Sequence, residues 1–105
     1  MACMINKYRN TPTVIDGRRF ASKREARRYV ALKLLERAGE ISSLSCQVRY
    51  PLTVNGLTVC SYVADFVYRD RAGQVVEDSK GYRTPMYRLK KLLMYAVHKI
   101  KILET

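Results

Sequence analysis

Three stretches in the middle of the chain carry the hydrophobic pattern of β-strands. Between positions 44 and 50 apolar side chains alternate with serine, glutamine and arginine, which is typical of a half-buried strand. Residues 57–68 are apolar on both faces, so this stretch predicts a strand in the middle of a sheet. Residues 74–80 predict a third strand. Asn-Gly at 55–56 and the turn-rich stretch 70–73 separate the three and predict antiparallel hairpins.

Before these strands, the pattern changes to the period of a helix. Ser22 followed by Glu25 fits a capping box, and Gly39 suits the end of the helix. We expect the buried stripe of this helix to consist of five residues: Ala26, Tyr29, Val30, Leu34 and Leu35. A short strand at 14–17 that enters an Asp-Gly turn is predicted to precede it.

A second helix is predicted after the strands. Thr84 is suited to cap it, and Pro85 is suited to its first position. Its expected buried stripe has helical spacing and consists of Leu89, Leu92, Leu93 and Ala96. Residues 100–103 predict a last strand.

The element order predicts a single α/β domain over residues 1–105. In it, two helices flank a mixed central sheet. A chain of this length supports one modest hydrophobic core. Residues 1–12 carry Lys7 and Arg9 and are predicted to form a flexible basic arm.

Charge indicates the kind of partner. The sequence has 20 Lys and Arg against 9 Asp and Glu, a net charge of +11, which favours polyanions. Nucleic acid is the first candidate partner and an anionic membrane surface the second. No apolar run approaches the about 20 residues of a spanning helix, and we see no signal-peptide pattern, so a cytoplasmic location is expected. Three widely spaced cysteines (Cys3, Cys46, Cys60) predict free thiols rather than disulfides or a zinc site.

Two acidic residues and a lysine are placed to meet on the predicted sheet. Asp65 lies in the apolar central strand, where an uncompensated charge is costly. Asp78 and Lys80 are two residues apart and share a face of the next strand, whereas Glu77 faces the other way. Carboxylate oxygens suit Mg²⁺, and a nearby ammonium stabilises charge that develops on a phosphate. The alternative is an ordinary hairpin with solvent-facing charges.

In order and spacing, these residues resemble the PD-(D/E)XK nuclease superfamily. The resemblance covers residues 22–103 and includes Glu25, Asp65 and the run Asp78-Ser79-Lys80. The segments around them, at 6–8, 20–23, 62–66 and 76–81, are similar to small phage and prophage proteins of that superfamily. Ala64 stands where the name-giving proline is found.

The resemblance implies a restriction-endonuclease-like αβββαβ core and a DNA endonuclease dependent on Mg²⁺ or Mn²⁺. Asp65 and Asp78 would hold the metal, Lys80 would assist the attacking water, and Glu25 would complete the site. Capping of the helix remains an alternative role for Glu25. Activity on branched DNA or DNA junctions, a homodimer, a bacterial or phage-infected host cell and no organic cofactor are further expectations.

The expected DNA contacts are basic side chains of the two helices: Arg24, Arg27, Arg28, Arg83, Arg88, Lys90 and Lys91. Gln47, on an adjacent strand, is a further candidate for the cleft, although a solvent-facing strand residue is the favoured interpretation. Tyr82 and Tyr87 are candidates for contact with a base or sugar, and His98 has no evident catalytic partner. Two other functions stay open: a non-catalytic nucleic-acid-binding domain with this fold, and a structural or regulatory protein that binds another protein.

Overall fold

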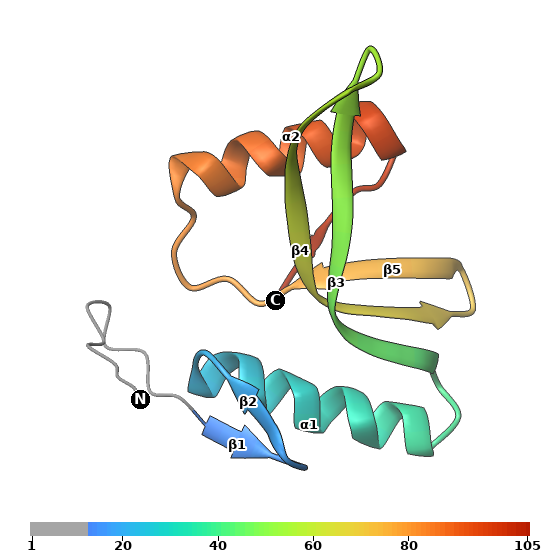
Figure 1. Ribbon diagram of the computed structural model, residues 1–105. Coiled ribbons are helices and arrows are strands. Elements are labelled where there is room, and N and C mark those ends of the chain that lie inside the picture. The colour runs from blue at the N-terminus through green and yellow to red at the C-terminus, as the bar shows by residue number, and fades with distance from the viewer. Residues whose placement is uncertain (1–12) are drawn as a thin grey trace.

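The computed structural model describes residues 13–105, so the expected basic arm, Cys3 and the segment 6–8 lie outside the described residues. The elements in chain order are β1 (Thr13–Ile15), β2 (Arg18–Phe20), α1 (Lys23–Arg37), β3 (Ser42–Val54), β4 (Leu57–Asp70), β5 (Gly73–Asp78), α2 (Pro85–His98) and β6 (Leu103–Glu104) (Figure 1). Within this part of the chain, no helix is both long enough and apolar enough to cross a bilayer.

The main sheet has the strand order β3-β4-β5-β6. Its first three strands are antiparallel, and β6 runs parallel to β5, so the prediction of a mixed sheet with two helices is confirmed. β4 is an interior strand, as its two apolar faces predicted. Asn55 and Gly56 both have positive φ, of 50° and 80°, and form the predicted two-residue turn between β3 and β4.

A two-stranded sheet before α1 departs from the prediction. β1 pairs with β2 across the Asp16-Gly17 turn, whereas the sequence predicted only the first of these strands. Strand ends also differ. β3 continues through Pro51 as an edge strand to Val54, and β6 lies at 103–104 rather than 100–103. β2 and β6 have three and two residues, which is too few to carry a hydrophobic period of their own.

Two apolar clusters form the core, one for each helix. The α1 cluster contains Tyr29 and Leu32 of α1 with Phe66 of β4, and the α2 cluster contains Tyr87 and Met94 of α2. In Figure 1, α1 lies below the sheet with the β1–β2 hairpin beside it, and α2 crosses behind the upper parts of β3 and β4.

The predicted buried stripes of both helices are correct only in part: Ala26 and Tyr29 are buried in α1, and Leu93 packs against the α2 cluster. In α2, Leu89 and Leu92 are 51% and 70% exposed and Ala96 is exposed, while Tyr87 and Met94 are buried. In α1, Val30, Leu34 and Leu35 are 41%, 58% and 37% exposed. Both helices carry apolar side chains around most of their circumference, so periodicity did not identify the buried face. Polar contacts help fix that face: Tyr29 donates a hydrogen bond to Asp16, and Tyr87 donates one to Glu104.

Candidate active site

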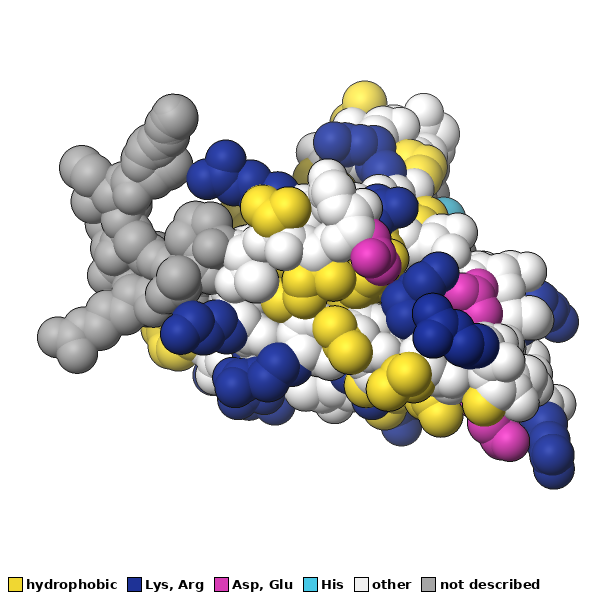
Figure 2. Space-filling model, turned by 90° about the horizontal axis from the view of Figure 1, so that it is seen from below, with side chains coloured by type: hydrophobic (Ala, Val, Ile, Leu, Met, Phe, Trp, Pro, Cys, Tyr) yellow, Lys and Arg dark blue, Asp and Glu magenta, His cyan; other side chains and the backbone are white. Residues whose placement is uncertain are grey.

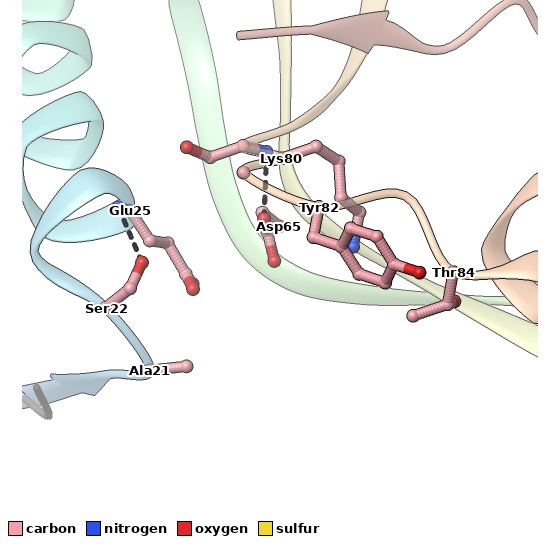
Figure 3. Close-up of a pocket in the computed structure, with 9 residues that line it drawn as sticks. Ala21, Ser22, Glu25, Asp65, Lys80, Tyr82 and Thr84 are labelled. Carbon is pink, nitrogen blue, oxygen red and sulfur yellow. Dashed lines mark hydrogen bonds between the residues drawn. The ribbon is translucent and has the colours of Figure 1, made fainter. Parts of the chain in front are cut away.

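A pocket of about 480 Å³ opens where the start of α1, the middle of β4 and the loop after β5 meet. The residues that line it are Ala21, Ser22, Glu25, Asp65, Ser79, Lys80, Gly81, Tyr82 and Thr84. Glu25 reaches into this space from α1 and Asp65 from the sheet, while Lys80 and Tyr82 lie on the opposite side (Figure 3). Three of the four predicted catalytic residues therefore line one concave surface.

The pocket lies where the two core clusters meet. On β3, Leu44 and Cys46 pack against the α1 cluster, whereas Val48 and Tyr50 pack against the α2 cluster. β4 changes cluster in the same way, because Tyr62 and Ala64 belong to the α2 cluster and Phe66 and Tyr68 to the α1 cluster. Asp65 and Gln47 sit at these changeover points, where each side chain escapes full burial.

Asp65 and Asp78 are neighbours across β4 and β5. The strand register pairs Phe66 with Glu77, and one more step along it places Asp65 opposite Asp78. Asp65 Oδ2 accepts a hydrogen bond of 3.0 Å from the Ser79 backbone N–H, which takes the place of a further ladder bond. Asp78 Oδ2 accepts a hydrogen bond of 2.5 Å from the Tyr62 hydroxyl. The two carboxylates therefore share one region of the sheet, as the sequence predicted.

Lys80 joins the acids from the loop after β5. Its Nζ lies 3.5 Å from Asp78 Oδ1 and 4.4 Å from the centre of the Tyr87 ring. The strand ends at Asp78 rather than at Lys80, but Lys80 N donates to the Thr105 carbonyl and Thr105 N donates to the Asp78 carbonyl. These bonds keep the chain extended, so Asp78 and Lys80 project together as the alternation predicted.

Glu25 serves the pocket and the helix start at once. Its backbone N–H donates to Ser22 Oγ at 3.2 Å, so Ser22 is the predicted cap, while its side chain is buried and turned to the pocket. Gln47 Nε2 donates to Glu25 Oε2 at 3.0 Å and lies 3.5 Å from Asp65 Oδ1. Gln47 is exposed, as the favoured interpretation had it, and its amide also contacts two of the predicted catalytic acids, which is the alternative that the sequence left open. Strand alternation contains no signal for its left-handed backbone, with φ of 54°.

The clustered acids disturb one another's ionisation. Burial, and then the nearby Asp65, raises the pKa of Asp78 to about 7. Burial and the charge of Asp78 raise the pKa of Glu25, whereas contacts with the Ala21 backbone, Lys80 and Gln47 act in the opposite direction. Burial raises the pKa of Tyr62, so it stays a hydrogen-bond donor to Asp78. Raised carboxyl pKa values beside a lysine in a pocket are typical of a functional site.

The raised pKa of Asp78 predicts a stability that falls as pH rises. A carboxyl whose folded pKa is about 7 and whose ordinary value is 3.8 holds its proton better in the folded state. The protein should therefore lose about 1–3 kcal/mol of unfolding free energy between pH 4 and 8 in chelator because of this group. Asp78→Asn should be more stable than the parent at pH 8 and equally stable at pH 4. Urea unfolding at both pH values measures this, and equal pH slopes for the two proteins would contradict it.

The carboxylates at the pocket can supply part of the coordination shell of a metal ion. Within residues 13–105, no three His, Cys, Asp or Glu side chains gather closely enough to form a ready cage. Asp78 Oδ1 is buried and lacks a hydrogen-bond partner among the described residues, although the Lys80 ammonium lies 3.5 Å away and the Asp65 carboxylate is close to Asp78. Mg²⁺ commonly uses one or two carboxylates and completes its shell with water and substrate phosphate. Asp65 and Asp78 fit that requirement, with Glu25 on the other side of the pocket.

Glu77, the neighbouring acid, is committed elsewhere. It is fully buried and accepts hydrogen bonds from Arg28, the Tyr68 hydroxyl and the Thr105 hydroxyl. Glu77 alternates with Asp78, so its side chain lies on the other face of the strand, as predicted. There it contacts Arg28 of α1. Because its oxygens already have partners, Asp78 is the acid of this pair that is available to the pocket.

The seven predicted DNA contacts separate into two groups. Arg28 pairs with Glu77, and Arg83 and Lys91 both pair with Glu104, at 2.8 and 3.0 Å. Hydrogen bonds from Arg83, Tyr87 and Lys91 lower the pKa of Glu104 to about 2. The other four have no such carboxylate partner among the described contacts: Arg24, Arg27, Arg88 and Lys90. Of these, Arg24 is the one beside the pocket, because its Nε lies 3.9 Å from the position of a Cβ built on Gly81.

The outer surface of the molecule on the side of α1 does not form one basic groove. Seen from below, its lysine and arginine side chains surround an apolar strip (Figure 2). Val30, Leu34 and Leu35 of α1 are among the exposed apolar side chains of the protein. Positive charge is therefore spread over this face.

Burial and position indicate what each of the remaining candidate residues contacts. Tyr82 is 73% exposed at the pocket rim, so it stays a candidate for contact with a base or sugar. Tyr87 is buried, so its ring supports Lys80 instead. His98 Nε2 lies 2.7 Å from the Pro51 carbonyl oxygen and joins the end of α2 to β3. Cys46 and Cys60 are half-buried free thiols.

Comparison with known proteins gives a family for the chain. No curated protein and no solved structure matches it. Residues 5–103 match the family model described as "Protein of unknown function (DUF1064)". This match spans nearly the whole chain, and the protein therefore belongs to the DUF1064 family.

Proposed function

We propose that this protein is a magnesium-dependent DNA endonuclease of the PD-(D/E)XK type. One observation carries the proposal: Asp65, Asp78 and Lys80 meet beside a pocket that Glu25 faces from another element. An ordinary hairpin with solvent-facing charges would not bury Asp78 to 1% exposure or leave one of its oxygens without a hydrogen bond.

The arrangement of the elements supports the same proposal. The order α1, β3, β4, β5, α2, β6 matches an αβββαβ core, and β6 runs parallel to β5. The acids lie on the second and third strands of this order and Glu25 on its first helix. The β1–β2 hairpin precedes α1 in the chain and is an addition to that core.

Each side chain then has a distinct task. A bound Mg²⁺ or Mn²⁺ would polarise the scissile phosphate and lower the pKa of an attacking water. Asp65 and Asp78 would hold the ion, with Glu25 completing the site. The Lys80 ammonium is steered by the Tyr87 ring and would stabilise negative charge on the phosphate oxygens.

The charge of the chain supports DNA as the substrate. A net charge of +11 gives sequence-independent attraction to phosphates, and Arg24, Arg27 and Arg88 are exposed for such contacts. Contacts of arginine side chains with phosphates carry no sequence information. This favours recognition of DNA shape, such as a branch or junction, over recognition of sequence.

We include a homodimer in this proposal, because cutting both strands requires two sites. Residues 50–64 contain no charged side chain, although 28% of the chain is charged. Leu57 and Val59 are 70% and 59% exposed on this hairpin, so two copies of a strongly cationic protein meet least repulsion there. Sedimentation of the free protein and of its DNA complex should show two copies, and a monomer in both states would remove the dimer from the proposal.

The decisive experiment uses the full chain with supercoiled, linear and four-way-junction DNA, with Mg²⁺ or with chelator. We expect nicking or cleavage only with Mg²⁺ or Mn²⁺, and binding in chelator that weakens steeply with salt. Salt-sensitive binding without cleavage under every metal condition would favour a non-catalytic nucleic-acid-binding domain. Little DNA affinity at physiological salt would favour a protein-binding role instead.

A further inference from the structure

Gln47 joins the two halves of the pocket. Its side-chain nitrogen donates to Glu25 at 3.0 Å and lies 3.5 Å from Asp65, so one amide group contacts an acid on α1 and an acid on β4. We propose that Gln47 is a positioning residue that holds the Glu25 carboxylate against Asp65 in the geometry that substrate and metal require. This inference rests on the proposed function, although the contact itself has its own test.

The backbone at Gln47 is adapted to this task. Its φ of 54° is uncommon for a residue other than glycine, asparagine or aspartate, and such a conformation strains the backbone. The neighbouring pairs Cys46–Phe66 and Val48–Ala64 keep the same register on either side of Gln47. The positive φ of Gln47 therefore adds no strand pairing. The left-handed residue stands where the strand changes core cluster, and its exposed side chain contacts two acids that line the pocket.

An amide is chemically suited to this place. Two carboxylates that face one pocket repel each other, and a lysine between them would neutralise the charge that a metal needs. The two N–H groups of a neutral amide can bond one oxygen of each acid and leave the others free. Partners of this kind, which orient ligands without touching the metal, typically change metal affinity or activity by about 10–100-fold when removed.

Two variants separate positioning from a structural role. Gln47→Asn keeps an amide and suits a positive φ better, but its side chain is one methylene shorter, so it should no longer reach Glu25. Gln47→Met keeps the length and lacks donors. Ser45→Ala, an exposed position on the same strand, is the matched control.

We expect Gln47→Asn to unfold at the same or a higher urea concentration than the parent while its kcat falls about 10–100-fold. Gln47→Met should show the same loss of kcat, and both variants should keep the parental KM for DNA. Both should also bind Mn²⁺ more weakly by calorimetry without DNA. Full activity and Mn²⁺ affinity in both variants would overturn the proposal, and so would a loss of activity in Gln47→Asn that is matched by a loss of stability.

A spectroscopic test is independent of nuclease activity. A side-chain amide proton of Gln47 should give an NMR signal shifted by its hydrogen bond to Glu25, and Glu25→Ala should move that signal to the position of glutamines without such a bond. If the parent signal already lies there, the contact is absent and the inference falls. If the signal behaves as expected but the protein neither binds metal nor cleaves DNA, the contact stands, and the proposed function and the catalytic purpose of Gln47 fall together.

Discussion

Replacing Glu77 with alanine should destabilise the protein by about 3–5 kcal/mol, the range found when one partner of a buried ion pair is removed. Glu77 is 0% exposed and lies in the interior of the sheet on β5. A loss of that size would remove much of the stability of a small domain, which is typically about 5–15 kcal/mol. Urea unfolding followed by circular dichroism measures it.

The expected size follows from the number of groups that Glu77 satisfies. Arg28 Nε and Nη2 donate to its two oxygens at 2.5 and 2.9 Å, the Tyr68 hydroxyl donates at 2.6 Å and the Thr105 hydroxyl at 3.0 Å. These partners come from α1, β4 and the end of the chain. Truncation therefore leaves several polar groups unpaired and releases the contacts by which β5 holds α1.

Two comparisons make the Glu77 prediction specific. Glu40→Ala removes an exposed carboxylate near the end of α1 and should change stability by less than about 0.5 kcal/mol. Tyr68→Phe removes one donor of the network and should cost about 1 kcal/mol. If Glu77→Ala were no more harmful than Glu40→Ala, the buried network would not contribute to stability as described.

The order of the large elements could be predicted from the sequence. Alternation in β3 and β5, the two apolar faces of β4 and the capping residues Ser22 and Thr84 are local signals, and the structure follows them. The buried faces of the helices are not local. They depend on where α1 and α2 meet the sheet, and apolar residues on several sides of each helix left that choice open.

The same distinction holds within the candidate site. Asp65, Asp78 and Lys80 could be predicted together, because strand register and alternation place them. The sequence left open whether Gln47 joins the acids, because its contacts with Glu25 and Asp65 accompany a positive φ and a change of core cluster that alternation does not signal. The partners of Arg28 and Arg83 could not be predicted, since Glu77 and Glu104 lie far from them in sequence.

Asp65→Asn should reduce magnesium-dependent cleavage by at least about 10³-fold, more than the about 10–100-fold typical for a residue that only supports a ligand. The change keeps the size of the side chain and an oxygen that can accept from Ser79 N, so the fold should persist. What is lost is a negative charge in the pocket. Single-turnover cleavage at saturating DNA and Mg²⁺ measures the effect.

Lys80→Ala should reduce cleavage by about 10²–10³-fold, the loss seen when a group that stabilises developing negative charge is removed. Saturating DNA separates this effect from the weaker binding that accompanies the loss of any one cation. Asp70→Asn and Lys101→Ala are the matched controls, because both change an exposed side chain that does not line the pocket. Lys80→Arg keeps the positive charge beside Asp78 and the Tyr87 ring, so it should retain more activity than Lys80→Ala. Equal cleavage by the parent, Asp65→Asn and Lys80→Ala would show that the phosphodiester is cut elsewhere or by a contaminant, since no other described pocket contains two of the four proposed catalytic residues.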